Sequence, residues 1–356
     1  MGIYFNYPTL LDIASQTSDG RIVNVATEFH KGTTFFKNAP WKEASHIDKD
    51  EGVFLKESER LARTKAMALG DGYTFSKSGY YKRIASLGRY GQAISWDEST
   101  LNAVPNKGVY MEREISNMLM SFGNDVEYSL LNISQDSDPR YAEGLLPRYS
   151  LITDGYGEIL DTTGAKTGVK TPFVCLDALG AKEDATRDGK LSSVLVVHFG
   201  DVNGVSLLYP RASDTIGFRY VMDSDYHWET NQDGTQRRAL TASVDVTCGI
   251  TVNNALACTR IANVDPEDET SLKTMMNHLF TAYDRMDTYM KNNVMIFTTQ
   301  EVVSAVRKLQ YNNIYHTTLA GIQALNLKGE VVIDNDVLTV CHNMLHTEGR
   351  ILGATV

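Results

Sequence analysis

Residues 51–95 restrict the fold of this 356-residue chain more than any other segment, because they cannot form a core of their own. Gly70-Asp71-Gly72 is a turn sequence in which Asp-Gly supplies the positive φ of a tight hairpin. The flanks, 53–67 and 73–94, are polar and alternate only weakly. We therefore predict a two-stranded hairpin that lies on another surface, since a lone hairpin is marginally stable in water.

Residues 1–50 also show little sign of a core of their own. Thr9 fits the N-cap of a short helix through Leu10–Ala14, which Gly20 would end. The residues that follow, up to Pro40 and Trp41, show no clear periodicity. We predict an arm rather than a domain core, and an arm of this length also needs something to pack on.

The hairpin segment and the segment after it carry opposite charge. Residues 51–95 contain eight basic and four acidic residues, a net charge of +4, and residues 96–138 contain two basic and eight acidic residues, a net charge of −6. Complementary patches steer and align subunits, but two solvated faces of opposite sign would give the same counts. The candidate interface residues are Lys56, Arg60, Arg63, Lys65, Lys77, Lys82, Arg83 and Arg89, opposed by Glu112, Glu114, Asp125 and Glu127.

The rest of the chain reads as a mixed body. A long amphipathic helix is expected over 109–132, with a second helix over 266–287 and a third after a strand at 294–297, capped by Thr298 and Glu301. Strands are expected at 194–197 and 205–209, joined as one hairpin around Gly200–Gly204. More antiparallel sheet is expected over 240–262, after the Asp233-Gly234 turn, and a further strand at 330–340. The predicted fold class is α+β.

Composition excludes several classes of protein. The formal charge of −10 disfavours a protein that grips nucleic-acid backbones. The start of the chain lacks the basic flank and apolar run of a signal peptide, and no stretch reaches the roughly 20 apolar residues of a membrane span. The four cysteines, Cys175, Cys248, Cys258 and Cys341, form no CxxC pair, so we expect buried free thiols in a reducing cytoplasm.

No sequence motif predicts a catalytic site or a cofactor-binding site. The run from Gly164 to Thr171 departs from a phosphate-binding loop because Val169 separates the second Gly from its Lys, so we predict a flexible loop. Cys341, His342 and His346 fall short of a zinc set, and Asp136-Ser137-Asp138 and Asp223-Ser224-Asp225 lack the remainder of a calcium loop. No spacing nominates a catalytic triad. We expect no catalytic, cofactor or metal site.

Several stretches carry a family resemblance through their order and spacing. They are PTLLDIA (8–14), APWKEAS (39–45), GLLPRYS (144–150), SLLYP (206–210), CGITVNNALACTRIANVD (248–265) and MIFTTQEVVSAVRKLQ (295–310). With the order of arm, hairpin, long helix and α+β body, the chain resembles the Hong Kong 97-like major capsid proteins of tailed bacteriophages. Within that group it is most similar to the capsid proteins of short-tailed phages of the epsilon-fifteen kind.

The resemblance implies a shell subunit divided into four parts. These are an N-terminal arm (1–50), an E-loop hairpin (51–97), a P-domain (98–190) with the 109–132 spine helix and returning C-terminal strands, and an A-domain (mainly 191–356). It implies hexamers and pentamers of an icosahedral shell around a double-stranded DNA genome, bound without sequence specificity. The hairpin of one subunit would lie over its neighbour's spine helix, which favours the intersubunit interpretation of the charge reversal. The Gly70–Gly72 tip would let the hairpin bend between quasi-equivalent positions in the shell.

The partners implied are other copies of the chain, together with scaffold, portal and decoration proteins, and no membrane. The location implied is the virion, after assembly in the host cytoplasm. Some relatives join subunits covalently through Lys and Asn, but no motif predicts that chemistry here. Two alternatives stay open: a soluble enzyme with an unrecognised site, or another virion component such as a tail or decoration protein.

Overall fold

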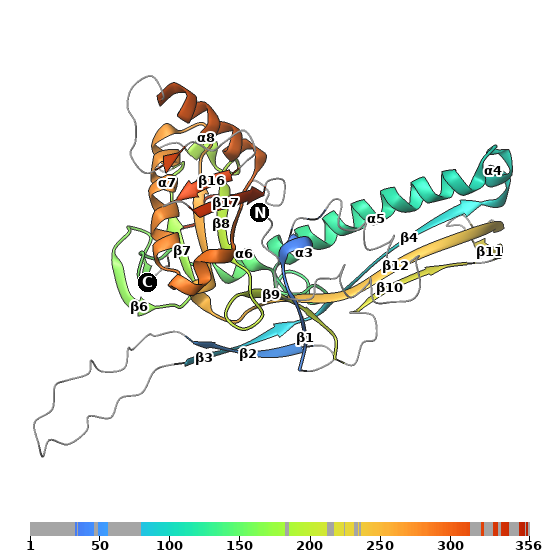
Figure 1. Cartoon of the computed structure of the whole chain (residues 1–356), viewed down its shortest axis with the longest axis horizontal. Coiled ribbons are helices and arrows are strands. Elements are labelled where there is room, and N and C mark those ends of the chain that lie inside the picture. The colour runs from blue at the N-terminus through green and yellow to red at the C-terminus, as the bar shows by residue number, and fades with distance from the viewer. Residues whose placement is uncertain are drawn as a thin grey trace, which may run out of the picture. The chain divides into compact units, whose positions relative to one another are not determined.

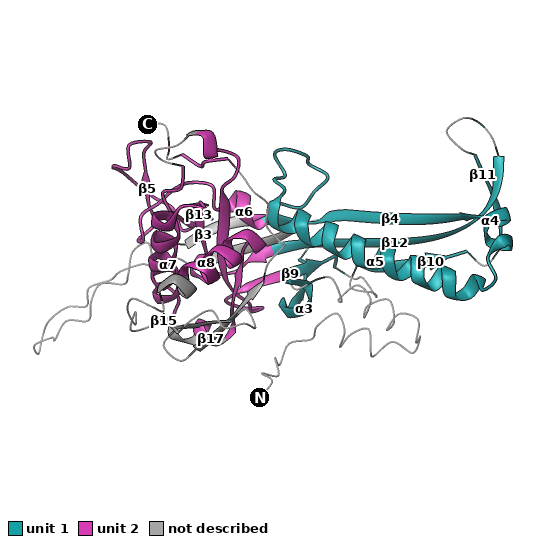
Figure 2. Cartoon of the chain, turned by 90° about the horizontal axis from the view of Figure 1, so that it is seen from above, with its two compact units in different colours: residues 1–50, 85–144, 207–250 teal, residues 51–84, 145–206, 251–356 magenta. Residues whose placement is uncertain are grey.

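The computed structural model describes residues 33, 35–45, 49–55, 80–181, 185–211, 217–223, 225–230, 234, 236–313, 322–323, 330–333, 336–341, 349–352 and 354. The chain forms two compact units, each assembled from separate stretches of sequence (Figure 2). Unit 1 comprises residues 1–50, 85–144 and 207–250, and unit 2 comprises residues 51–84, 145–206 and 251–356.

Unit 1 is built around one long strand. Its elements are α3 (Phe35–Asn38), β1 (Trp41–Glu43), β4 (Gly88–Asp97), α4 (Glu98–Ala103), α5 (Lys107–Asn132), β9 (Val205–Tyr209), β10 (Phe218–Met222), β11 (His227–Thr230) and β12 (Gln236–Val252). The 17-residue β12 pairs with β9, β10, β11 and β4, and β1 extends the sheet by pairing in parallel with β9. The strands β10, β11 and β4 all run antiparallel to β12, as the turn at Asp233-Gly234 predicted for this region.

The helix α5 packs along β4 and β12 (Figure 1). It begins after Asn106, whose side chain accepts the backbone N–H of Val109 at 3.4 Å, and its 26 residues would extend about 39 Å. The predicted stripe is buried through Met118, Leu119, Phe122, Val126 and Leu130. The prediction of a helix over 109–132 is therefore confirmed, with a start two residues earlier.

Residues 35–45 belong to the core of unit 1. Phe35 and Phe36 are fully buried, and Phe36 stacks on Trp41 with ring centroids 5.7 Å apart. The assignment of 1–50 to an arm that packs on another surface stays a prediction, and within it Phe35, Phe36 and Trp41 are buried although their spacing has no regular period. The helix predicted near Thr9 lies outside the described residues.

The base of the predicted hairpin is present as a two-stranded sheet of β2 (Lys49–Leu55) and β3 (Tyr80–Ser86). Residues 56–79, which contain the predicted tip, lie outside the described residues. The hairpin was predicted to extend to residue 94, which is wrong, because 88–97 form β4 and pair with β12 over ten positions. The alternation in this stretch belongs to the large sheet.

Unit 2 contains a seven-stranded mixed sheet in the order β15-β16-β17-β14-β8-β13-β7. The sheet strands are β7 (Val174–Asp177), β8 (Ser192–His198), β13 (Cys258–Val264), β14 (Val294–Phe297), β15 (Ile322–Gln323), β16 (Glu330–Ile333) and β17 (Asp336–Cys341). The other elements are α6 (Leu145–Arg148), β5 (Glu158–Leu160), β6 (Lys166–Lys170), η1 (Ala185–Arg187), η2 (Ala255–Ala257), α7 (Glu269–Asp284), η3 (Thr288–Asn293) and α8 (Gln300–Asn313). Every residue of β8 and β13 is buried, and α7 packs on both strands (Figure 1).

The strands predicted at 194–197 and 205–209 exist, but they do not form a hairpin. β8 pairs with β13 and β14, whereas β9 pairs with β1 and β12 in the sheet of unit 1. A strand that is apolar on both faces is typical of the centre of a sheet, where it needs a neighbour along each edge. β8 takes these neighbours from later in the chain, and the short turn does not decide its pairing.

The helices and strands of the C-terminal half mostly follow the prediction. α7 and α8 lie within the predicted helical segments, and β14 has the predicted bounds. The predicted cap of α8 is wrong by one residue: Thr299 Oγ1 accepts the backbone N–H of Val302 at 3.5 Å, while Thr298 donates its hydroxyl to the carbonyl of Ser193. The single strand predicted at 330–340 is two antiparallel strands, β16 and β17.

Candidate assembly surface

The sheet of unit 1 has one face that α5 covers and one that it does not. Paired residues on neighbouring strands share a face, and successive residues alternate between faces. The covered face contains Tyr90, Trp96, Leu240, Val244 and Val246, which are all at most 9% exposed. The opposite side, here termed the open face, contains Arg89, Gly91, Ala93, Ser95, Thr241, Ser243, Asp245 and Thr247, all exposed or partly exposed.

Small and polar side chains dominate the open face. Arg89 pairs with Asp245 at 3.2 Å, with 72% and 34% of the two side chains exposed. Gly91 lies opposite Asp245, and a Cβ atom at position 91 would come within 2.5 Å of the Asp245 carboxylate. A glycine here lets the carboxylate lie across the neighbouring strand. The open face is therefore hydrophilic, and it does not have the apolar side chains of a core that awaits covering.

A hydrogen-bond network around Glu229 organises one end of this face. Glu229 accepts hydrogen bonds from Ser95 Oγ at 2.7 Å, from Thr241 Oγ1 at 2.9 Å and from Arg237 at 3.1 Å. The bond from Ser95, followed by those from Thr241 and Arg237, lowers the pKa of Glu229 to about 2. His227 lies 3.1 Å from Asp223 and 3.3 Å from Glu229. These contacts fix β11 against β12 and β4.

The outer side of α5 offers a second exposed surface. Glu112 and Asp125 are exposed, Glu114 is partly buried, and the apolar side chains of Val109 and Tyr128 are 60% and 41% exposed. The acidic residues predicted at an interface are therefore accessible at three of the four positions. Their contact with a neighbouring copy stays a prediction.

The fourth acidic residue, Glu127, does not reach the surface. Its side chain is fully buried, and its carboxylate accepts the backbone N–H of Phe35 at 2.5 Å. Its placement on an interface is contradicted by this burial, because residue 127 follows Val126 on the inward side of α5. Glu127 instead joins α5 to the start of α3 within unit 1.

Most of the basic residues predicted at the interface fall outside the described part of the chain. Lys56, Arg60, Arg63, Lys65 and Lys77, with the tip Gly70-Asp71-Gly72, lie outside the described residues. Lys82 and Arg83 lie on β3, and their side chains are not described. Arg89 is on the open face. The open face itself was missed from the sequence, although the alternation of Thr241, Ser243, Asp245 and Thr247 with apolar residues is the signal for it.

The segment from Gly164 to Thr171 is not the flexible loop that was predicted. Lys166–Lys170 form β6, which pairs antiparallel with β5, and Lys166 binds Asp154 and Glu158 at 2.6 and 3.3 Å. Gly164 and Gly168 adopt positive φ angles of 86° and 76°, as tight β-turns and bulges require. Lys166 is thus held by carboxylates, and β6 is followed by the strand β7 and not by a helix that could bind a phosphate.

Other candidate chemistry resolves into structural roles. Asp138 lies in a turn and pairs with Arg140 at 2.6 Å, which lowers the pKa of this carboxyl to about 2. Cys175, Cys248 and Cys258 are buried free thiols, as predicted, and burial raises the pKa of Cys258 to about 12. Within the described residues, no group of three or more His, Cys, Asp or Glu side chains is placed to hold a metal ion. None of the described helices is long and apolar enough to cross a membrane.

Known proteins resemble this chain over most of its length. A family model described as "Major capsid protein GP7" matches residues 17–352. A search of curated proteins finds no match. Among solved structures, a chain of bacteriophage epsilon15 aligns with a TM-score of 0.54 and 16% identity, covering 98% of both chains. The capsid of bacteriophage JBD30 aligns with a TM-score of 0.46 and 8% identity, covering 96% of this chain and 99% of that one.

The similarity to the epsilon15 chain concerns the fold alone, since the identity is low. It extends over the whole chain and so includes both units. Together with the family match, it confirms the predicted α+β, Hong Kong 97-like capsid fold.

Proposed function

The chain belongs to the family of major capsid proteins described as GP7 and is a subunit of an icosahedral virion shell, and from this premise we propose how it assembles. Copies form hexamers and pentamers that enclose double-stranded DNA without reading its sequence. Each copy contributes an N-terminal arm and an E-loop, and unit 1 takes the role of the P-domain and unit 2 that of the A-domain. The protein acts as a structural subunit without a catalytic step.

The observation that carries this proposal is the incomplete covering of unit 1. α5 protects one side of the sheet, while the open face and the outer side of α5 stay accessible in the single chain. A protein that functions in a shell buries such surfaces against its neighbours. Because the open face is polar, it suits a contact that forms after folding, since an apolar face of the same size would promote aggregation.

The segment between β2 and β3 is the proposed partner for these surfaces. Residues 56–79 contain five basic and three acidic residues, a net charge of +2, and the exposed Glu112 and Asp125 lie on the outer side of α5. We propose that the hairpin of one copy lies over α5 of the next. Opposite charges across such a contact set its register and speed the encounter, and they contribute less to its final affinity. Glu127 has no part in this contact.

Scaffold, portal and decoration proteins are further proposed partners. They follow from the family resemblance, since a closed shell needs a controlled size and one vertex through which DNA enters. No particular surface of the chain is assigned to any of them.

A deletion tests the hairpin contact directly. Residues 56–79 are replaced by Asn-Gly, which connects β2 to β3 through a two-residue turn that suits antiparallel strands. The shortened protein is expected to remain folded, with an unchanged far-UV circular dichroism spectrum, and to form no closed particles by sedimentation and negative-stain microscopy.

A charge-reversal variant tests the other side of the same contact. Changing Glu112 and Asp125 to Lys adds positive charge to the acceptor surface without altering the hairpin, and is expected to reduce assembly as well. Asp287→Lys, at an exposed position between α7 and η3, is the matched control and should assemble normally. Closed particles of normal size from the protein lacking 56–79 would refute the proposed contact.

A further inference from the structure

We infer that an exposed tyrosine on unit 2, Tyr156, inserts into a groove between α7 and α8 of a neighbouring copy. This contact would join A-domains in a ring, in addition to the contact proposed for the hairpin and α5. The inference rests on the proposed function, since it requires that copies of the chain assemble. It concerns a different surface, so the two can be tested separately.

Tyr156 is presented by a rigid turn. Its side chain is 86% exposed, and the turn is fixed by Asp154, whose Oδ1 accepts the backbone N–H groups of Tyr156 at 2.9 Å and Glu158 at 2.8 Å. Gly157 adopts a φ of 84°, and Lys166 binds the second oxygen of Asp154 at 2.6 Å. Because the backbone of the turn is already ordered, binding would order only the tyrosine side chain, and tyrosine is among the residues that often dominate interface energies.

The turn lies near the C-terminal end of α7. A Cβ atom at Gly155 would lie 3.2 Å from Cγ2 of Thr281, so the backbone of the turn approaches this end of the helix closely. The approach fixes where Tyr156 projects relative to α7. Val169, on β6, which pairs with β5 after the turn, is also 58% exposed.

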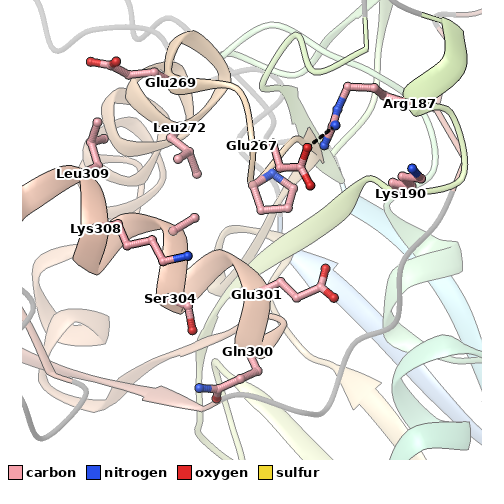
Figure 3. Close-up of a pocket in the computed structure, with 12 residues that line it drawn as sticks. Arg187, Lys190, Glu267, Glu269, Leu272, Gln300, Glu301, Ser304, Lys308 and Leu309 are labelled. Atoms are coloured by element: carbon pink, nitrogen blue, oxygen red, sulfur yellow. Dashed lines mark hydrogen bonds and ion pairs between the residues drawn. The ribbon is translucent and has the colours of Figure 1, made fainter.

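The groove lies at the other end of α7. It has a volume of about 780 Å³ and is bounded by α7, α8 and the segment around Arg187 (Figure 3). Pro266, Leu272, Ala305 and Leu309 supply its apolar part, and Lys190, Glu301 and Lys308 supply polar groups at its margin. Arg187 is fixed in the wall by ion pairs to Asp265 and Glu267, so this side of the groove is preformed.

The chemistry of the groove suits a tyrosine side chain. The aromatic ring can pack on Leu272 and Leu309, while the phenol hydroxyl can bond to Glu301 or Lys308 at the margin. An amphipathic side chain is favoured in a site with an apolar floor and a polar rim. Figure 3 shows Leu272 and Leu309 on neighbouring helices and Lys308 and Glu301 along α8.

The positions of the two surfaces exclude Tyr156 of the same copy from the groove, and the proposed shell supplies Tyr156 of a second copy as the occupant. Leu272 in the groove and Thr281 beside the turn are nine residues apart on α7, a separation of about 14 Å along the helix axis. Tyr156 therefore does not share an end of α7 with the groove. A contact that uses two different surfaces of the same unit is heterologous, and heterologous contacts generate rings when the rotation closes. A capsomer is a ring of this kind.

Disulfide trapping tests the contact in assembled particles. The double variant Y156C/S304C places one cysteine on the turn and one in the groove. Oxidation is expected to produce a ladder of covalent dimers, trimers and higher species on a non-reducing gel. Y156C and S304C alone control for the native cysteines, and V202C/S304C controls for collision, because Val202 is 69% exposed elsewhere on unit 2.

A second measurement uses the tyrosine itself. Y156A is expected to require about tenfold more protein for half-maximal assembly, in line with the loss of a central aromatic contact. Y156F should lie between Y156A and the wild type, and V202A should match the wild type. If Y156C fails to assemble while S304C assembles, the failure of Y156C reports the same loss of the tyrosine contact as Y156A.

Two results would overturn the inference. One is particles of Y156C/S304C without a ladder beyond that of the single variants, and the other is Y156A assembling like V202A. Either result leaves the capsid function intact, because wild-type particles still form. Failure of the wild-type chain to form particles under any condition would instead count against the proposed function.

Discussion

In unit 2 the strands β8 and β13 are buried along every residue, whereas in unit 1 β4 and β12 alternate between a buried and an accessible face. The first pattern belongs to a sheet enclosed within its own unit. The second belongs to a sheet that α5 covers on one side only. For a shell subunit, the difference suggests that unit 2 reaches its final packing within one copy, while unit 1 reaches it only beside a neighbour.

The largest expected effect of a single substitution is on the core of unit 2. Phe297 is fully buried and makes an edge-to-face contact with Phe199, with ring centroids 6.0 Å apart. Phe297→Ala should lower the free energy of unfolding by about 3–5 kcal/mol through a lost side chain and a new cavity. The measurement is urea unfolding followed by far-UV circular dichroism.

Tryptophan fluorescence extends this test to the comparison between the units. The three tryptophans, Trp41, Trp96 and Trp228, all lie in unit 1. If the units unfold separately, Phe297→Ala shifts the circular dichroism transition and leaves the fluorescence transition in place. If both transitions shift together, the two units form one cooperative system, and the contrast between them does not extend to their stability. Val202→Ala is the control for an exposed position.

Within unit 1, Glu127 is expected to have the next largest effect. Glu127→Leu removes the acceptor for the backbone N–H of Phe35 at a fully buried position. An unsatisfied buried donor costs about 1–3 kcal/mol, and the fluorescence transition should move by that amount because Trp41 packs beside α3. Glu127→Gln keeps an acceptor oxygen and should be milder. Equal losses for both variants would show that the charge matters more than the hydrogen bond.

Glu229 provides a pH-dependent test of the polar side of the sheet. Its pKa is lowered from 4.5 to about 2, first by Ser95 and then by Thr241 and Arg237. Because the folded-state pKa lies below the unfolded value, the ionised carboxylate stabilises the fold above pH 4.5, and this stabilisation is lost as the pH falls from 4.5 to 2. Glu229→Gln should therefore show a smaller decline in thermal midpoint over this range.

The matched control for this pH series is Glu112→Gln, on the exposed side of α5. Its decline in thermal midpoint between pH 4.5 and 2 should follow that of the wild type. If Glu229→Gln declines in the same way, the network around Glu229 does not stabilise β11 against β12 and β4.

The sequence predicts elements that are decided locally and fails where distant segments decide. The apolar stripe of α5 and the strand β14 need only their own residues, and both were placed to within two positions. β8 was paired with the wrong strand, because a strand apolar on both faces does not indicate which neighbours it will take. The correct neighbours lie some 60 to 100 residues away in the chain.

The candidate surface shows the same limit. Glutamate is usually exposed, so Glu127 was predicted at the surface by its residue type. Only its position next to Val126 on the inward side of α5 indicates that it is buried. The burial of Phe35, Phe36 and Trp41 was missed for a related reason, since they have no period and pack on elements from elsewhere in unit 1. The open face was detectable in principle from alternation in β12, but its exposure depends on α5 covering the opposite side and nothing in the described residues covering this one.

Arg89 should show the smallest effect on stability and the clearest effect on assembly. Its ion pair with Asp245 is largely solvent-exposed, and such pairs contribute about 0.2–1 kcal/mol and weaken with salt. Arg89→Glu should therefore leave the unfolding transition within about 1 kcal/mol of the wild type. If neighbouring copies use the open face, the reversed charge should still reduce the fraction of protein in closed particles.

The matched control for Arg89→Glu is Lys273→Glu, which disrupts an exposed pair with Glu269 on α7 of unit 2. Equal assembly by the two variants would mean that neighbouring copies do not contact the open face. The contrast between the units would then be only that one sheet is exposed to solvent on one side and the other is not. A selective loss for Arg89→Glu would show that a surface nearly neutral for folding is required for the shell. That outcome would separate the two requirements on unit 1, because folding uses the side of the sheet under α5 and assembly uses the other.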